Sequence, residues 1–235
     1  MLTVDRLCVD IGRSRILGDV SLRVAAQEVV CLVGRNGAGK TTTLRTIMGY
    51  LAPTSGTIDF DGRRLNGLPT HAIAAIGVAF SPEEGGIFGG LTVGENIEIA
   101  TWTRASRRSP AERMEQAYAV FPNLRRYASR GGTQISGGER KMLSIARALA
   151  LDPELLLLDE PFEGLSPSII PAVGRGIAAV TRLGPGILLA ESNIHHVPEY
   201  ASRLYVIERG EIVFSGSVAD ARRDPHVFRI AGGTP

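Results

Sequence analysis

Apolar residues in this chain fall into short unbroken runs of four or five, separated by polar and glycine-containing segments. Such runs are typical of parallel strands, because helices cover both faces of a parallel sheet. The expected strands are 29–33, 76–80, 155–158, 187–190 and 204–207. After the last of these, Arg209-Gly210 predicts the turn of an antiparallel hairpin over 207–213.

Helical patterns lie between these strands. The expected helices run from Lys40 to about Tyr50, over 112–121 and over 136–150. Strands that alternate with helices predict an α/β fold with a parallel central sheet. From about 83 to 150 the pattern contains only loops and helices. This predicts a single domain whose core, about 1–82 and 151–235, carries a helical subdomain as an insert.

Composition narrows the class of protein. The 235 residues suffice for one large α/β domain, and the net charge of +2 comes with scattered arginines, so nucleic acid is not an expected partner. Lysine occurs only at Lys40 and Lys141, a codon bias which still suggests that each lysine is needed as lysine. Cys8 and Cys31 show no metal or redox spacing. No apolar run approaches the ~18 residues of a membrane span and the N-terminus is no signal peptide, so a membrane role requires docking onto another subunit.

The first candidate site is a glycine-rich loop that follows the strand 29–33 and precedes a helix. It fits the pattern G-x-x-x-x-G-K-[ST], in which backbone N–H groups and a helix N-terminus surround the phosphates of a nucleotide. In this pattern Lys40 contacts the β- and γ-phosphates, and the Thr41 hydroxyl is a ligand of Mg²⁺. The loop consists of Gly34, Arg35, Asn36, Gly37, Ala38, Gly39, Lys40, Thr41 and Thr42.

Two carboxylates follow the apolar strand 155–158. Because open α/β sheets bind ligands at the carboxyl ends of their strands, we expect Asp159 and Glu160 beside the glycine-rich loop. Asp159 is then a candidate Mg²⁺ ligand, and Glu160 is a candidate general base for an attacking water. A buried strand with a polar end is the alternative, and the presence of the glycine-rich loop disfavours it.

A second phosphate-recognition surface is predicted at Ser136-Gly137-Gly138-Glu139. Ser136 and Glu139 also fit a capping box at the start of a helix, which needs no ligand. Two glycines weaken a first helical turn, however, and a γ-phosphate lying close to the backbone would explain them. Since one triphosphate does not need two such surfaces in one chain, the motif predicts two chains that complete each other's sites.

The glycine-rich loop, Ile135 to Glu139 and Leu157 to Pro161 together resemble the motifs of the ATP-binding cassette (ABC) ATPases, in that family's order and spacing. The resemblance covers essentially the whole chain. It implies a P-loop core of the RecA type with an N-terminal antiparallel β part, ATP and Mg²⁺ as ligands, and ATP hydrolysis. It also implies head-to-tail dimers, in which the helix that begins at Ser136-Gly137-Gly138-Glu139, the family's signature motif, faces the partner's glycine-rich loop. Closure of the dimer then moves membrane permease subunits.

Other segments resemble one branch of that family. Phe121–Leu124, the segment Ile87–Asn96, and the D-loop Glu160–Pro167 resemble the shorter ATPase of branched-chain amino acid importers. This resemblance implies a peripheral subunit at the cytoplasmic face of the membrane, with permease subunits, an identical or sister ATPase and, indirectly, a periplasmic binding protein. We expect exposed apolar residues of 87–96 to contact a permease, from a loop rich in glycine that is mobile until a partner orders it.

Three positions depart from the family's pattern. Ile11 stands where an aromatic residue usually stacks on adenine. Glu83 replaces the glutamine of the Q-loop, where a carboxylate can bind Mg²⁺ but adds negative charge to the site. Ser192 replaces the switch histidine and is too short to meet the γ-phosphate without a water, so we expect slow hydrolysis. A local shift that brings His195 to the γ-phosphate stays open, although His195 and His196 fit the first turn of the next helix.

The main interpretation is therefore the motor subunit of an ABC importer. A soluble cassette ATPase of DNA repair or translation is weaker, because such proteins usually carry two cassettes or a long coiled coil, whereas this chain has one cassette and no heptads. A regulatory cassette that binds ATP without useful turnover is the third alternative. Ser192 and Glu83 favour it, and Lys40 and Glu160 oppose it.

Overall fold

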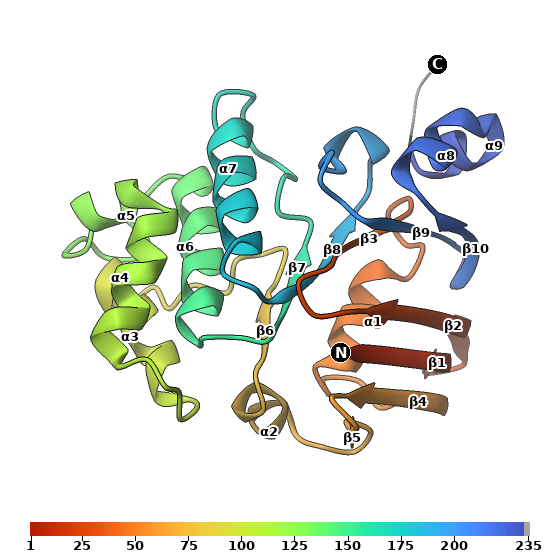
Figure 1. Ribbon diagram of the computed structural model, residues 1–235, viewed down its shortest axis with the longest axis horizontal. Helices are drawn as coiled ribbons and strands as arrows, with labels where there is room; N and C mark the ends of the chain where they lie inside the picture. The colour runs from red at the N-terminus through yellow and green to blue at the C-terminus, as the bar shows by residue number, and fades with distance from the viewer. Residues whose placement is uncertain (233–235) are drawn as a thin grey trace.

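Two sheets form the framework of the computed structural model, which describes residues 1–232 (Figure 1). One is antiparallel, with the strand order β2-β1-β4-β5, and the other has the order β10-β9-β3-β8-β7-β6. In the second sheet β9, β3, β8, β7 and β6 run parallel, and β10 is the antiparallel edge. The strands are β1 (Leu2–Ile11), β2 (Ser14–Val24), β3 (Val29–Val33), β4 (Ser55–Phe60), β5 (Arg63–Arg64), β6 (Val78–Ser81), β7 (Leu155–Asp159), β8 (Gly186–Glu191), β9 (Arg203–Glu208) and β10 (Glu211–Gly216).

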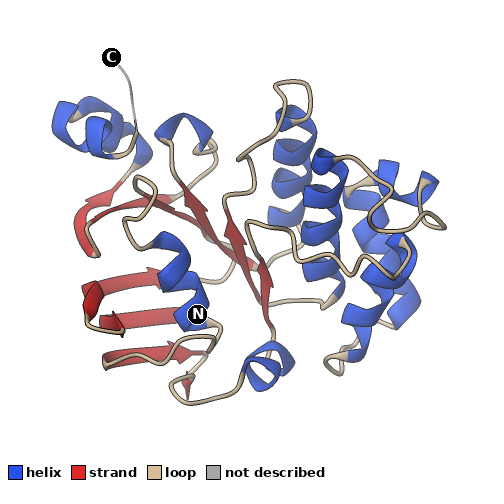
Figure 2. Cartoon of the chain, turned by 180° about the vertical axis from the view of Figure 1, so that it is seen from behind, coloured by secondary structure: helices blue, strands red, loops and turns tan. Residues whose placement is uncertain are grey.

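The helices divide into groups around the six-stranded sheet. Helices α3 to α6 lie together beside β6 and β7, on the side away from the antiparallel sheet, and α8 and α9 lie at the other end (Figures 1 and 2). None of the helices within residues 1–232 has the length and apolar character needed to cross a bilayer. The helices are α1 (Lys40–Ile47), α2 (Thr70–Ala75), α3 (Val93–Glu98), η1 (Ile99–Trp102), α4 (Pro110–Val120), α5 (Pro122–Arg126), α6 (Gly137–Ala150), α7 (Ile170–Thr181), η2 (Ile194–His196), α8 (Val218–Arg223) and α9 (Pro225–Ile230).

Side chains of the parallel strands alternate between two hydrophobic cores. Cys31 of β3 packs in the core that contains residues of α3 to α7, whereas its neighbour Leu32 packs in the core shared with the antiparallel sheet and α1. All five residues of β3 and of β7 are buried, which explains their unbroken apolar runs. The predicted α/β fold with a parallel sheet and an antiparallel N-terminal part is confirmed. The last three residues of the core range 151–235 lie outside the described residues.

Three predicted boundaries are wrong. Helix α4 begins at Pro110, after the N-cap Ser109, rather than at 112. Helix α1 ends at Ile47 rather than near Tyr50, because Gly49 (φ 75°) ends it: the Gly49 N–H donates to Thr46 O and the Tyr50 N–H to Arg45 O, the pattern of a Schellman motif. Strand β6 begins at Val78 rather than 76, because residues 76 and 77 close the C-terminus of α2. The predicted hairpin does join β9 to β10 through Arg209-Gly210.

Candidate functional site

The carboxyl edge of the six-stranded sheet brings together two motifs that are more than a hundred residues apart. Strand β3 leads into the glycine-rich loop, and strand β7 ends at Asp159. The Lys40 Nζ lies 3.0 Å from Glu160 Oε1, and the Thr41 hydroxyl donates a hydrogen bond of 3.1 Å to Asp159 Oδ1. The structure thus places four sequence-predicted residues in contact.

The glycine-rich loop folds around its own lysine. The Lys40 ammonium donates to Gly34 O at 2.7 Å and to Arg35 O at 3.2 Å, and Lys40 is only 4% exposed. A Cβ on Gly34 would lie 2.2 Å from Ile207 O, and Gly39 has φ 114°. Glycine at these two positions is therefore required by the chain's own packing and backbone conformation, as well as by any phosphate.

A cavity of about 450 Å³ opens over this loop. Ile11 and Glu83, which the sequence assigned only by resemblance, both line it, and Ile11 is 49% exposed. Sequence reasoning did not assign Ile16 or Glu163 to this site, although Glu163 lies in the D-loop 160–167. The lining residues are Ile11, Ile16, Asn36, Gly37, Gly39, Lys40, Thr41, Thr42, Glu83, Glu160 and Glu163.

Asp159 has the environment of a cation ligand. Its side chain is 2% exposed, and its Oδ2 accepts no hydrogen bond from any residue that the structure describes. Burial raises the pKa of the Asp159 carboxyl to about 6, and the hydrogen bond from Thr41 opposes that shift. A buried carboxylate oxygen without a partner, beside a threonine hydroxyl, fits a divalent cation held by oxygen ligands. Asp159 does not itself line the cavity over the glycine-rich loop, whereas its hydrogen-bond partner Thr41 does, and Glu83 supplies a further carboxylate there.

Glu160 is held at both carboxylate oxygens. Its Oε1 pairs with Lys40, and its Oε2 accepts the backbone N–H of Ser192 at 3.1 Å. The residue at the switch position therefore contacts the candidate base through its amide, whatever its side chain. Glu160 also has a left-handed backbone (φ 47°), which is unusual for a residue other than glycine.

The two histidines after Ser192 lie in the short helix η2, close to the predicted first turn. The exposed His195 meets the ring of Phe228 edge-on, with 5.6 Å between centroids, and so faces α9 rather than the glycine-rich loop. His196 Nδ1 lies 3.1 Å from Glu191 Oε2 at the end of β8. The contact between His196 and Glu191 was not predicted, because nothing in the local sequence marks it.

Ser136 begins the signature helix α6 with a complete capping box. The Ser136 N–H donates to Glu139 Oε2 at 2.7 Å, and the Glu139 N–H donates to Ser136 Oγ at 3.3 Å. Ser136 and Gly137 are exposed, and neither lines the cavity over the glycine-rich loop. The capping box and a surface for another molecule are thus compatible.

The explanation of the two signature glycines needs correction at one of them. A Cβ on Gly138 would lie 2.7 Å from Ile169 Cγ2, so contact within the chain accounts for this glycine without a phosphate. A Cβ on Gly137 would meet only the Arg140 guanidinium, at 3.9 Å. The argument for a closely approaching ligand therefore holds for Gly137 alone.

Lys141, the second lysine, connects the signature helix to the Q-loop. Its Nζ donates to Glu83 O at 2.7 Å, and burial lowers the pKa of this ammonium. The scarcity of lysine was the sequence signal for such a role, but it did not indicate the partner.

Contacts within the chain hold the 85–90 loop, which the sequence predicts to be mobile until a partner orders it. The fully buried Asn96 accepts the Phe88 N–H at 2.9 Å and donates to Phe88 O at 3.0 Å. The Arg147 guanidinium donates to Gly86 O at 2.6 Å and lies over the Phe88 ring, 5.1 Å from its centroid. These contacts all come from the loop's own chain, and Phe88 is 50% exposed.

Comparison with known proteins identifies the family to which this chain belongs. Residues 17–163 match the family described as ABC transporter. The chain belongs to this family. It is 39% identical over 228 residues to the high-affinity branched-chain amino acid transport ATP-binding protein BraG of Pseudomonas aeruginosa, covering 97% of each chain. It is also 34% identical over 232 residues to the lipopolysaccharide export system ATP-binding protein LptB of Haemophilus influenzae, covering 98% of this chain and 96% of LptB.

A solved ATP-binding subunit of an ABC transporter has the same fold. The two structures superpose with a TM-score of 0.83 at 29% sequence identity, covering 100% of this chain and 95% of the other. The chain is thus the ATPase subunit of an ABC transporter, and its resemblance to the ATPases of branched-chain amino acid importers is confirmed.

Proposed function

We propose that this subunit drives an ABC importer of branched-chain or related amino acids from the cytoplasmic face of the membrane. The 39% identity to BraG supports this substrate class, as do the segment Phe121–Leu124 and the D-loop. The 34% identity to LptB makes lipopolysaccharide export the second candidate function.

The observation that carries the catalytic assignment is the buried contact between Lys40 and Glu160. A triphosphate on the glycine-rich loop would draw the Lys40 ammonium toward its β- and γ-phosphates and away from Glu160. The carboxylate released in this way would accept a proton from the water that attacks the γ-phosphate. Thr41, Asp159 and Glu83 would hold Mg²⁺, which when bound neutralises phosphate charge.

We propose that two such subunits close on ATP, because Ser136 and Gly137 are exposed and lie outside the chain's own loop cavity. The partner is a second copy or a sister ATPase. Each Gly137 would then approach the γ-phosphate on the other subunit's loop, with Ser136 and Glu139 setting the start of the helix.

A permease subunit would dock at the junction between the core and the helical subdomain, 83–150. A cavity of about 280 Å³ lies there and is lined by Tyr50 and Phe80 from the core and by Phe88 and Arg147 from the subdomain. Tyr50 is 57% exposed and Phe88 is 50% exposed, so apolar surface is available to a partner. A periplasmic binding protein would act through the permeases.

Two substitutions test the catalytic assignment. Lys40→Ala should lose ATP binding, because it removes the charge that faces the phosphates. Glu160→Gln should keep ATP binding, lose turnover and accumulate an ATP-bound dimer. Nucleotide affinity, ATPase rate and oligomeric state are measured on each variant, with Glu154→Gln at the opposite sheet edge as the matched control. Normal turnover in Glu160→Gln would remove the general-base assignment.

The substrate is tested in proteoliposomes that contain this subunit and the permeases encoded beside it. ATP-dependent uptake of leucine in the presence of the binding protein, absent with Glu160→Gln, would support the import of branched-chain amino acids. ATPase activity that responds to lipopolysaccharide and not to leucine would favour the second candidate instead.

A further inference from the structure

The backbone of Glu160 needs support from its surroundings. Its φ of 47° lies in the left-handed region, which is unfavourable for a residue with a side chain and persists only where neighbouring contacts enforce it. One such contact is made by Glu160 itself: its backbone N–H donates to Ala190 O in β8 at 3.0 Å.

A second contact acts two residues further along the D-loop. The backbone N–H of Phe162 donates to Glu191 Oε1 at 3.3 Å. Glu191 is the last residue of β8 and is fully buried. Two backbone N–H groups, of Glu160 and of Phe162, therefore donate to neighbouring residues of β8: one to the main-chain oxygen of Ala190 and one to the carboxylate of Glu191.

His196 completes a closed set of contacts around that carboxylate. Its Nδ1 lies 3.1 Å from Glu191 Oε2, and its ring lies against the Phe162 ring, with 5.9 Å between centroids. Glu191 thus touches His196 through one oxygen and the D-loop amide through the other, while His196 and Phe162 touch each other.

Burying the Glu191 carboxylate at the end of an apolar strand has a cost in desolvation free energy. Burial raises the pKa of Glu191, and the hydrogen bond to Glu191 raises the pKa of His196. An apolar residue would pack here without the cost of desolvation, but it would leave the Phe162 N–H without an acceptor. The carboxylate therefore fits a positioning task better than a packing task.

The main chain of Glu191 and Ser192 contacts the glycine-rich loop and the Glu160 side chain. Glu191 O accepts the Gly34 N–H of the glycine-rich loop at 3.1 Å, and the Ser192 N–H donates to Glu160 Oε2. These bonds do not depend on the Glu191 side chain. Removing that side chain should consequently disturb the D-loop and Glu160 while leaving the nucleotide loop in place.

We propose that Glu191, oriented by His196, is a positioning residue for hydrolysis: it binds the Phe162 amide and so keeps Glu160 in its left-handed conformation. This inference rests on Glu160 as the general base of the proposed function. It goes beyond that function because neither Glu191 nor His196 touches the nucleotide cavity.

The test is steady-state ATPase activity of the full chain over a range of ATP concentrations, with thermal unfolding of every variant. Glu191→Ala should lower kcat by about 10- to 100-fold, the scale expected for a misplaced catalytic group, with KM changed by less than about threefold. Glu191→Gln should restore most of the activity, because its amide oxygen can still accept the Phe162 N–H. His196→Phe should lower kcat, and His196→Asn, which keeps a donor near Nδ1, should not.

His195→Phe is the matched control, since His195 neighbours His196 but faces Phe228. If Glu191→Ala fails to fold, the half-buried His196 variants decide the question. Wild-type kcat in both Glu191→Ala and His196→Phe would overturn the proposal, as would a loss confined to KM or equal losses in Glu191→Gln and Glu191→Ala. Glu160→Gln distinguishes failure of the proposed function from failure of this inference. Normal turnover in Glu160→Gln would contradict the proposed function. An inactive Glu160→Gln together with a normally active Glu191→Ala would contradict only the positioning role of Glu191.

Discussion

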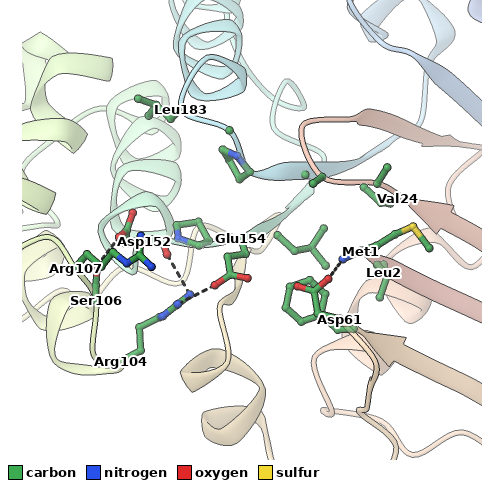
Figure 3. Close-up of a pocket in the computed structure, with 18 of the residues that line it drawn as sticks. Met1, Leu2, Val24, Asp61, Arg104, Ser106, Arg107, Asp152, Glu154 and Leu183 are labelled. Atoms are coloured by element: carbon green, nitrogen blue, oxygen red, sulfur yellow. Dashed lines mark hydrogen bonds and ion pairs between the residues drawn. The ribbon is translucent and has the colours of Figure 1, made fainter.

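The charged residues at the amino ends of the parallel strands (the amino edge of the sheet) and at their carboxyl ends (the carboxyl edge) differ in how deeply they are buried. At the amino edge, a cavity of about 820 Å³ is lined by charged residues that pair with one another. Arg104 pairs with Glu154 at 3.0 Å (Figure 3), and Arg108 pairs with Asp152 at 2.5 Å. One partner of each of these pairs is about half exposed. The cavity at the carboxyl edge is smaller, about 450 Å³, but the side chains of Lys40 and Glu160 there are at most 4% exposed.

Burial rather than size therefore distinguishes the functional edge. Exposed ion pairs cost little and contribute little, whereas buried charges require a specific arrangement to be tolerated. Parallel topology explains which edge carries them, because the loops that follow the strands converge at the carboxyl ends. The larger cavity lies among the segments that precede β7 and β8 and contains none of the predicted site residues.

The largest effect expected from this difference is on stability at the carboxyl edge. The pKa of Asp159 is raised to about 6 in the folded chain, against an ordinary value of 3.8, so the folded state holds this proton more tightly than the unfolded state. The resulting stabilisation is present below pH 3.8 and is lost as the pH rises through 6. Relative to Asp159→Asn, the wild-type free energy of unfolding should fall by on the order of 3 kcal/mol between pH 4 and 7. Urea denaturation without nucleotide measures this, and parallel pH profiles would contradict it.

The same substitution should reduce function. An asparagine at position 159 keeps an oxygen for the Thr41 hydroxyl but loses the charge that binds Mg²⁺, so the ATPase rate should fall roughly 10- to 100-fold. The Tm without nucleotide should rise at pH 7. A variant that is both more stable and fully active would show that Asp159 does not bind the metal.

Gly137→Asp tests whether the ATP site at the carboxyl edge needs the signature motif of a second subunit. A Cβ at position 137 would meet only the Arg140 guanidinium, in ordinary van der Waals contact at 3.9 Å, so the fold and ATP binding by the monomer should be preserved. The new carboxylate would repel the γ-phosphate of the partner's ATP and lower the ATPase rate by at least about tenfold. Gly138→Asp is the contrasting variant, because Ile169 makes it disturb its own chain as well. Weak ATP binding by the Gly137→Asp monomer would contradict a role across the dimer.

Ser192→His should raise the ATPase rate several-fold. The backbone N–H that contacts Glu160 is retained, and the imidazole adds a donor directed at the γ-phosphate. His195→Ala should leave the rate unchanged, because that ring packs on Phe228. An unchanged rate in Ser192→His together with an inactive His195→Ala would mean that His195 is the switch.

The smallest effect is expected at the amino edge. Asp152→Asn weakens partly exposed contacts with Arg108 and Ser106, so it should cost at most about 1 kcal/mol in the free energy of unfolding and leave ATPase activity unchanged. Thermal denaturation and the ATPase assay, run beside Asp159→Asn, compare one aspartate at each edge. A loss of activity in Asp152→Asn would remove the distinction between the two edges.

Local patterns were sufficient for the strands, the hairpin and the glycine-rich loop. An unbroken apolar run such as 155–158 specifies burial on both faces wherever the strand lies, and the loop motif contains its own turn geometry. The local patterns did not indicate contacts made by residues outside the motifs. Asn96 and Arg147 form hydrogen bonds with the 85–90 loop, and the Ile169 side chain leaves little room for a Cβ on Gly138.

The sequence by itself determined the chemistry of this protein: a phosphate-binding loop, two carboxylates at the end of a strand, and a parallel sheet to bring them to one edge. Each of these features is encoded within a few residues of the chain, where spacing alone constrains geometry. Only the tertiary structure decided which groups hold the reactive ones in place, as Glu191 and His196 contact the D-loop and Ser192 contacts Glu160 through its backbone. Such contacts join residues far apart in the chain or depend on main-chain atoms common to every residue, and so they leave no pattern in the sequence.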